Sequence, residues 1–255
     1  MSALLQVDGL SRHFGGVRAV DDVSFAVAAG EIVGLIGPNG AGKTTVINLL
    51  SGLLRPTAGR IVFAGARLDR LPPYQIARAG VARTYQNIRL FRGLSALDNV
   101  IVGTHGTTRE PFVKRLAFAP SVRREEAAAR ATARALLDRV GLAHRARARA
   151  TSLPYGEQRR LEIARALAAR PRLLLLDEPA AGMNPAEMAT LVALIRALAA
   201  EGQTILLIEH NMQVVMGVCQ RIVVLNFGRK IAEGPPSAIS RDPDVVAAYL
   251  GESDE

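Results

Sequence analysis

The sequence predicts an α/β fold with a P-loop core, an antiparallel β edge near the N-terminus and an inserted α-helical subdomain. Three observations lead to this prediction. A glycine-rich stretch at 37–45 lies between an apolar run typical of a strand and one typical of a helix. Two further apolar runs, at 173–178 and 204–210, are typical of strands buried on both faces. From about residue 88 to residue 159, strand signals disappear and helical periodicity replaces them.

Size and composition agree with one large domain. The chain has 255 residues, 49% of them hydrophobic, which is enough for a sizeable core. We expect a single domain over 1–255, with its core in 1–87 and 160–255 and the helical subdomain at about 88–159. The one cysteine, Cys219, excludes an internal disulfide, indicates a reducing compartment and is expected to lie inert in a helix. The sequence indicates neither a signal peptide nor an apolar run of the roughly 18 residues that a bilayer span needs.

The N-terminal part predicts two strands. Residues 4–8 and 22–27 alternate apolar and polar side chains, which is typical of strands at a sheet edge. The stretch between them reads R-H-F-G-G-V-R-A-V and predicts a turn that carries Phe14. An aromatic ring at such a turn can stack on a nucleotide base, although by residue type alone core packing is an equal alternative.

The stretch at 37–45 reads G-P-N-G-A-G-K-T-T and fits the phosphate-loop pattern G-x-x-x-x-G-K-[ST]. The glycines let successive N–H groups face inward as an anion nest, and the following helix adds the partial positive charge of its N-terminus. Lys43 can then reach the β- and γ-phosphates, and the Thr44 hydroxyl can hold Mg²⁺. The predicted phosphate contacts are Gly37, Pro38, Asn39, Gly40, Ala41, Gly42, Lys43, Thr44 and Thr45.

The next elements are a strand at 61–65, a short helix at 71–78 and a strand at 81–87 that ends in polar residues. Gln86 therefore leaves a strand of the sheet that carries the phosphate loop. Its amide can contact Mg²⁺ and an attacking water. A loop amide with ordinary hydrogen bonds is the commoner alternative for a single glutamine.

The helical region contains two clear periodic stretches, at 95–102 and at 123–140, and Gly141 ends the second. Its middle, Gly103 to Ser121, is predicted to be loop-like because it holds Pro111 and Pro120. Further on, L-P-Y-G-E-Q at 153–158 predicts a turn that opens a helix at Glu157. A helix opening offers N–H groups to an anion. Two anion sites in one chain suggest two nucleotides bound between two chains.

Charged residues follow the two buried strands. Asp177 and Glu178 end the run L-L-L-L-D-E, at the edge where α/β sheets bind ligands. Asp177 can hold Mg²⁺ through water, and Glu178 can act as a general base. His210 ends the second run, where a neutral imidazole can hydrogen-bond phosphate and water, although a single histidine is more often structural. The C-terminal part predicts strands near 221–225 and 229–232, short helices, and a capped helix in D-P-D-V-V-A-A-Y-L-G.

These motifs together resemble the ATP-binding subunits of ABC transporters. The resemblance depends on five features besides the phosphate loop, in this order: Gln86, L-P-Y-G-E-Q, L-L-L-L-D-E, A-A-G-M-N at 180–184, and His210. Longer stretches, such as R-T-Y-Q-N-I-R-L-F at 83–91 and L-L-I-E-H-N-M at 206–212, are similar to the ATPases of bacterial high-affinity importers for branched-chain amino acids. The resemblance covers essentially the whole chain.

The resemblance implies a RecA-like core that binds ATP with Mg²⁺ and hydrolyses ATP. By position, Phe14 stacks on adenine, Glu178 is the catalytic base and His210 is the switch residue. The complete set implied is catalytic Lys43, Gln86, Glu178 and His210; nucleotide contacts from Phe14, from 37–45 and from Tyr155, Gly156 and Glu157; and Mg²⁺ contacts from Thr44, Gln86 and Asp177.

The resemblance also implies partners. Two chains form a head-to-tail dimer, in which residues 153–157 of one chain meet the γ-phosphate held by the other, and Ala181 to Asn184 lie at the seam. The dimer partner is a second copy or a second, LivF-like ATPase subunit. Two transmembrane permease subunits and, indirectly, a periplasmic substrate-binding protein complete the system, with this chain peripheral at the cytoplasmic face of the bacterial inner membrane. Nucleic acid is not an expected partner.

One residue departs from the family pattern. The usual L-S-G-G-Q reads L-P-Y-G-E here, so Pro154 replaces the serine whose hydroxyl contacts the γ-phosphate. Proline supplies neither a hydroxyl nor an N–H. We therefore expect a weaker γ-phosphate contact at the site that this segment completes, and two unequal ATP sites in a heterodimer.

The positive charge of the segment 109–149 has two possible interpretations. Between Arg109 and Arg149 there are 11 Lys/Arg and four Asp/Glu, so seven of the nine surplus positive charges lie in one segment. A solvated helix face is the commoner explanation, and a surface that faces permeases and anionic headgroups is the functional one. The alternatives for the whole chain are an ABC ATPase for other amino acids, amides, urea or lipopolysaccharide, or one that acts on nucleic acid without a transporter.

Overall fold

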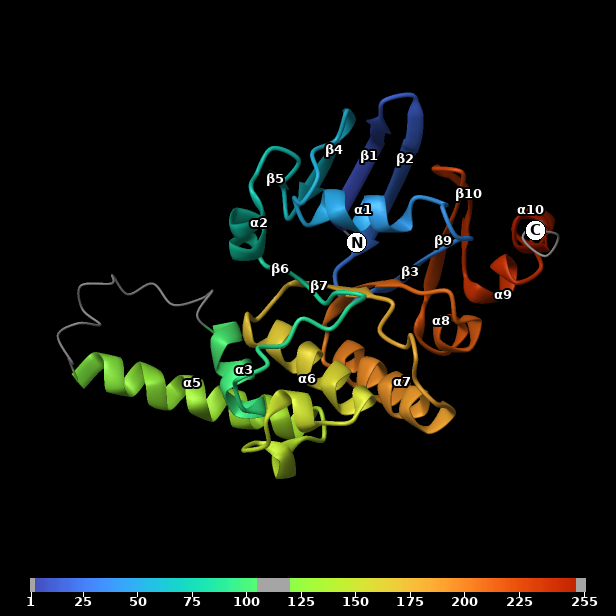
Figure 1. The fold of residues 1–255 in the computed structure, drawn as a ribbon. Helices are drawn as coiled ribbons and strands as arrows, with labels where there is room; N and C mark the ends of the chain where they lie inside the picture. The colour runs from blue at the N-terminus through green and yellow to red at the C-terminus, as the bar shows by residue number, and fades with distance from the viewer. Residues whose placement is uncertain (1–2, 105–119, 251–255) are drawn as a thin grey trace. The chain divides into compact units, whose positions relative to one another are not determined.

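The computed structural model describes residues 3–104 and 120–250. It forms two compact units, one of residues 1–83 and 172–255 and one of residues 84–171 (Figure 1). The second unit contains the whole of the segment 88–159 that the sequence predicts as a helical insertion, and extends past it at both ends. In the described part of the chain, no helix is both long and apolar enough to cross a membrane.

A six-stranded sheet forms the base of the first unit. Its strand order is β10-β9-β3-β8-β7-β6, and every neighbouring pair except β9 with β10 is parallel. All five residues of each of β3, β7 and β8 are buried, as the apolar runs predict for strands covered on both faces. The bounds are β3 Ile32–Ile36, β6 Val81–Arg83, β7 Leu173–Asp177, β8 Thr204–Ile208, β9 Arg221–Asn226 and β10 Arg229–Gly234.

The strands β3, β8 and β7 are adjacent and parallel, so their carboxyl ends meet at one edge of the sheet. The phosphate loop follows β3, Glu178 follows β7, and His210 lies two residues beyond β8. The prediction that His210 terminates the strand is wrong, since Ile208 is the last residue of β8. The strand predicted at 81–87 is also shorter, because only Val81–Arg83 pair with β7.

The antiparallel β edge predicted near the N-terminus is present as a second sheet. This antiparallel sheet has the order β2-β1-β4-β5, with β1 Ala3–Phe14, β2 Val17–Ala28, β4 Ala58–Phe63 and β5 Ala66–Arg67. Both β1 and β2 are longer than predicted, and Phe14 ends β1 instead of lying within a nine-residue turn. Several β-bulges in the β1–β2 ladder interrupt the alternation of apolar and polar residues, and this hides the true strand length from the sequence pattern. The strand predicted at 61–65 begins earlier, at Ala58, and ends at Phe63.

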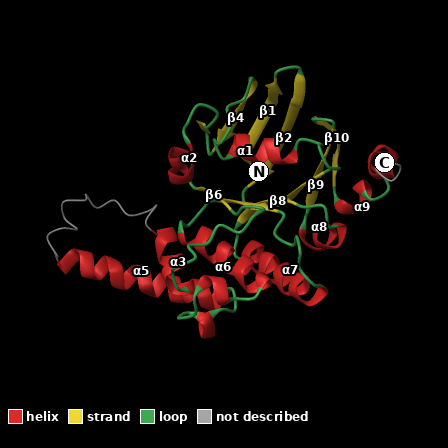
Figure 2. Cartoon of the chain, in the orientation of Figure 1, coloured by secondary structure: helices red, strands yellow, loops and turns green. Residues whose placement is uncertain are grey.

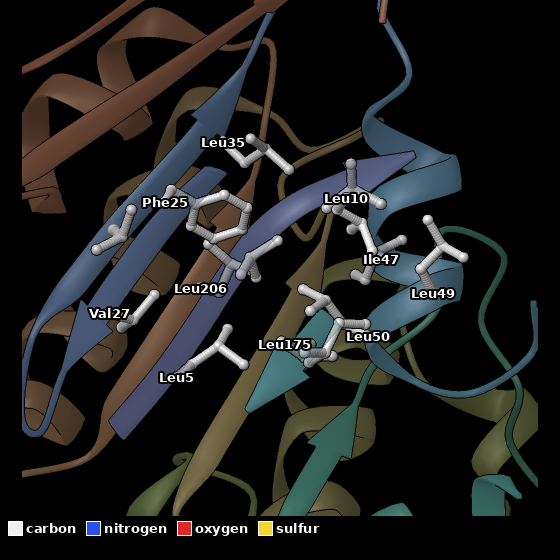
Figure 3. Close-up of a cluster of buried hydrophobic side chains, with 14 of the residues drawn as sticks. Leu5, Leu10, Phe25, Val27, Leu35, Ile47, Leu49, Leu50, Leu175 and Leu206 are labelled. Carbon is white, nitrogen blue, oxygen red and sulfur yellow. The ribbon is translucent and has the colours of Figure 1, made fainter. Parts of the chain in front are cut away.

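The core of the first unit lies between the two sheets and the helix α1, Lys43–Leu50 (Figure 3). β1 and β2 contribute Leu5, Leu10, Phe25 and Val27; α1 contributes Ile47, Leu49 and Leu50; and the main sheet contributes Leu35, Leu175 and Leu206. Each such side chain gains about 1.5–3 kcal/mol from burial. The apolar face of α1 therefore anchors the phosphate loop to the core.

The other helices of the first unit are α2 Pro73–Ala79, α7 Pro185–Ala200, α8 Met212–Val218, α9 Pro236–Ile239 and α10 Pro243–Leu250. The predicted cap of α10 is confirmed, because the Asp242 carboxylate accepts from the N–H groups of Asp244 and Val245 at 2.9 and 3.2 Å. Cys219 lies directly after α8 and not within it, and burial raises the pKa of its thiol to about 12. It is therefore inert in the folded chain, as predicted.

A capping box opens α7. The Asn184 side chain accepts from the Glu187 N–H at 3.0 Å, and the Glu187 carboxylate accepts from the Asn184 N–H at 3.1 Å. We expect Asn184→Ala to lower the free energy of unfolding by about 1 kcal/mol, because one N–H at the start of the helix loses its acceptor. Urea denaturation measures this change. The matched control is Thr190→Ala on the exposed side of the same helix, which should stay within about 0.5 kcal/mol of wild type; equal losses in the two variants would contradict a specific capping role.

The second unit is built from helices (Figure 2). They are α3 Ala96–Thr104, α5 Pro120–Arg139 and α6 Tyr155–Ala168, with 3₁₀ turns at Ala143–Arg145 and Ala150–Ser152. Gly141 follows α5 with a φ of 71°, which confirms the predicted stop. α6 begins at Tyr155, two residues before the predicted Glu157, with Pro154 as its N-cap. Of the loop predicted from Gly103 to Ser121, the two ends belong to α3 and α5, and residues 105–119 with Pro111 lie outside the described part.

Candidate functional site

The phosphate loop requires glycine at two positions. Gly37 and Gly42 have φ values of 149° and 100°, which other residues rarely adopt. A Cβ atom at Gly37 would lie 2.1 Å from the carbonyl oxygen of Leu225, and one at Gly42 would lie 2.4 Å from that of Ala19. The loop therefore packs directly against the backbone of β9 and β2, with no room for side chains.

Lys43 lies inside the curl of this loop. Its side chain is buried, and Nζ donates to the carbonyl oxygens of Gly37 at 2.6 Å and Pro38 at 2.8 Å. The α1 N-terminus has no side-chain cap at Gly42 and no acidic residue in its first turn, which holds Thr44 and Thr45. A buried ammonium, a helix N-terminus and a glycine-rich loop thus lie together, and each of them favours an anion. The donor set therefore fits the phosphates of a nucleotide.

Asp177, the last residue of β7, is paired with an arginine that the sequence reasoning missed. Arg83 Nη2 donates to Asp177 Oδ2 at 2.8 Å, and both side chains are buried. Arg83 Nη1 also donates to Asn48 Oδ1 at 2.7 Å and to Ser51 Oγ at 3.0 Å, both on or next to α1. The guanidinium thus ties the carboxylate to the helix that follows the phosphate loop. The sequence shows Arg83 only as a basic residue after two apolar ones. Asp177 can be recognised as its partner only when β6 is known to pair with β7.

Glu178 and His210 lie close together, on the loops after β7 and β8. His210 Nδ1 is 3.8 Å from Glu178 Oε2. Glu178 adopts a left-handed φ of 46°, and its N–H donates to the Ile208 carbonyl at the end of β8 at 2.9 Å. The imidazole side chain is 59% exposed and the carboxylate 17%, so both are accessible to water and substrate.

The residue between β8 and His210 is a second feature that the sequence reasoning missed. Glu209 is fully buried, and its carboxylate accepts from the backbone N–H groups of Ala180, His210 and Asn211. Burial raises the pKa of Glu209, while these hydrogen bonds oppose the rise. Its position in the middle of I-E-H gave no sign that it reaches the loop after Glu178.

Phe14 is 43% exposed at the end of β1, with the Arg12 guanidinium 4.5 Å from the centre of its ring. A cation–π contact of this kind orients an exposed ring. The residue is thus placed where a planar ligand can reach it, as base stacking requires.

The second unit holds Gln86 and the helix opening at 153–157. Arg159 of α6 is 2% exposed and donates to the carbonyl oxygens of Tyr85 and Gln86, to the Tyr155 hydroxyl and to Glu162. The backbone at Gln86 is therefore fixed to α6 by a buried guanidinium. Arg159 was also missed by the sequence reasoning, because an arginine in a helix is usually exposed to solvent.

At the opening of α6, Glu157 in the first turn pairs with Arg145 at 3.1 Å. This pairing offsets the charge that would otherwise repel an anion from the helix N-terminus. Pro154, the N-cap, makes no side-chain cap hydrogen bond. Backbone N–H groups are therefore the donors of this end of the helix.

Comparisons with known proteins agree with this site. A family model described as "ABC transporter" matches residues 20–181, and one described as "Branched-chain amino acid ATP-binding cassette transporter" matches residues 229–255. The chain is 48% identical over 251 residues to the high-affinity branched-chain amino acid transport ATP-binding protein LivG of Escherichia coli (strain K12), which covers 98% of both chains. It is 47% identical, with the same coverage, to the corresponding protein BraF of Pseudomonas aeruginosa.

A solved structure shows the same fold. The ADP conformation of MJ1267, an ATP-binding cassette of an ABC transporter, superposes with a TM-score of 0.86 at 29% identity, over 98% of this chain and 100% of that one. The predicted fold and the resemblance indicated by the motifs are confirmed by these matches.

Proposed function

The chain belongs to the ABC transporter family, and from this we propose that it is the ATP-binding and ATP-hydrolysing subunit of an importer for branched-chain amino acids. The observation that carries the proposal is the set of three loops at one edge of the main sheet. One holds Lys43 inside a glycine cradle, one begins at Glu178 directly after Asp177, and one carries His210 beside Glu178. The cargo rests on the similarity to LivG and BraF over nearly the full length of the chain.

In this proposal, the cradle at 37–45 binds the ATP phosphates and Phe14 stacks on adenine. Lys43 exchanges its two carbonyl acceptors for phosphate oxygens, so that its charge faces the β- and γ-phosphates. Thr44, Gln86 and Asp177 would hold Mg²⁺, which supplies neutralising charge to the transferred phosphoryl group when bound. The Arg83–Asp177 pair supports this assignment, because it fixes one carboxylate oxygen and orients the other.

Glu178 accepts a proton from the water that attacks the γ-phosphorus, while the bond to the bridging oxygen of ADP breaks. His210, 3.8 Å from Glu178, donates to that carboxylate or to the transferred phosphoryl group, and so links the base to the substrate. The left-handed φ of Glu178 supports this role, since strained residues cluster at functional sites.

The dimer and the membrane partners belong to the same proposal. Residues 153–157 of one chain meet the γ-phosphate held by a second copy or by a second ATPase subunit, with Ala181 to Asn184 at the seam. Because Pro154 offers neither a hydroxyl nor an N–H, the site completed by this chain binds the γ-phosphate more weakly. Two permease subunits and a periplasmic binding protein complete the importer, and the chain is peripheral at the cytoplasmic face of the inner membrane.

We expect Lys43→Met to lower the affinity for MgATP at least tenfold, because the buried ammonium that faces the phosphates is lost. Calorimetric titration of the purified full-length chain with MgATP measures this. In cells, the same variant should reduce uptake of radiolabelled leucine to the level of a strain that lacks the gene.

Lys230→Met is the matched control, because Lys230 is exposed on β10 and pairs only with Glu233 among the described residues. It should keep both MgATP affinity and leucine uptake. Unchanged MgATP affinity in Lys43→Met would reject the phosphate site. Loss of affinity with normal leucine uptake would instead reject the cargo and leave the ATPase assignment intact.

A further inference from the structure

Glu209 has an unusual environment for a carboxylate. It has no exposed surface, and among the described residues no lysine or arginine pairs with it. Removing a carboxylate from water is unfavourable unless other groups replace the lost hydrogen bonds. Backbone N–H groups provide that replacement here, and they come from two different loops.

Each oxygen of the Glu209 carboxylate binds a different loop. Oε1 accepts from the N–H of Ala180 at 2.7 Å, and Ala180 lies two residues after Glu178. Oε2 accepts from the N–H groups of His210 at 3.1 Å and Asn211 at 3.2 Å. A single side chain therefore joins the backbone that carries Glu178 to the backbone that carries His210.

The backbone of Glu178 needs such support. Its left-handed conformation is strained and persists only when neighbouring groups enforce it. On its N-terminal side, its N–H is bound to the carbonyl of Ile208. On its C-terminal side, the Glu209 carboxylate accepts from the N–H of Ala180. The loop around Glu178 is therefore held at both ends.

We propose that Glu209 is a positioning residue, which holds the general base Glu178 and the histidine His210 at the separation that water activation requires. The inference rests on the proposed function, since it assumes the roles assigned to those two residues. General-base catalysis depends on placement, and a displacement of about 1 Å can cost about 100-fold in rate. The three N–H groups that Glu209 binds all lie outside 37–45, so nucleotide binding does not depend on it.

The test is Glu209→Gln in the purified full-length chain. The amide has one acceptor oxygen where the carboxylate has two, so it cannot bind both loops in the same way. We expect kcat for ATP hydrolysis to fall about 10–100-fold while Kd for MgATP stays within about twofold. Hydrogen exchange of the Ala180, His210 and Asn211 amides should become faster, since these are the donors to the carboxylate. Glu201→Gln, an exposed glutamate after α7, is the control and should change none of these quantities.

A double variant separates positioning from a general loss of structure. If Glu209 acts through His210, then Glu209→Gln in a His210→Ala background should lower the single-turnover rate by much less than it does in wild type. Glu209→Asp keeps the charge but shortens the side chain by one methylene. It should also lower kcat without weakening MgATP binding.

Several results would overturn the inference. These are a kcat within twofold of wild type, a parallel loss of MgATP affinity, or effects of Glu209→Gln and His210→Ala that simply multiply. If neither Glu209 variant folds, the residue is structural and the positioning role is rejected. If Glu178→Gln hydrolyses ATP at the wild-type rate, the proposed function fails, whereas a slow Glu178→Gln beside a normal Glu209→Gln rejects this inference alone.

Discussion

Glu178→Gln is expected to bind MgATP as wild type does, yet to hydrolyse it about 10²–10⁴-fold more slowly, which is the usual contribution of a general base. The amide keeps the size of the side chain but cannot accept a proton from water. In the proposed dimer the γ-phosphate bridges the two chains until it is cleaved, so the variant should also accumulate as an ATP-bound dimer. Phosphate release measures the rate, and size-exclusion chromatography with and without MgATP measures the dimer.

Glu126→Gln is a suitable control, because it makes the same chemical change on the exposed side of α5. It should match wild type in rate and in elution volume. A normal rate in Glu178→Gln would show that another group takes the proton. A slow rate without a trapped dimer would keep Glu178 as the base but reject the closed dimer.

Arg83→Met should lower the free energy of unfolding by about 3–5 kcal/mol, which is the usual cost of removing one partner from a buried ion pair. Met fills much of the same volume, but it leaves the Asp177 carboxylate buried without its guanidinium, and it leaves Asn48 and Ser51 without the donor they share. The midpoint of urea denaturation measures this loss.

Two further variants make this prediction specific. Arg70→Met, at an exposed position, should change stability by less than about 0.5 kcal/mol. Adding Asp177→Asn to Arg83→Met should restore part of the loss, since the unpaired buried charge is then removed. If Arg83→Met were as stable as Arg70→Met, the pair would contribute nothing to the fold.

The sequence predicted those parts of the site whose residues are consecutive in the chain. The phosphate loop can be recognised from the nine residues at 37–45 alone. The acidic pair lies at the end of the strand that positions it. The residues that were missed act across long separations. Arg83 and Asp177 are 94 positions apart, and Arg159 and Gln86 are 73 apart. Such partners depend on strand order and helix packing, which the local pattern does not contain.

The same reason explains the errors in the fold. The strands β3, β7 and β8 were predicted because burial on both faces makes each of them a continuous apolar run. β1 and β2 were predicted too short because their bulges are set by the pairing of the two strands and not by either sequence alone. The start of α6 at Tyr155 was missed because Pro154 is a favourable residue just before a helix as well as in a turn.

The buried thiol after α8 makes this chain convenient for site-directed labelling. Maleimides and similar reagents attack the thiolate, and burial raises the pKa of Cys219 to about 12, so its side chain stays a thiol at neutral pH. A cysteine introduced at an exposed position would therefore be the only reactive one in the folded chain. Spin or fluorescent probes placed in pairs on the two units could then report their separation through the ATP cycle, with no need to replace the native cysteine first.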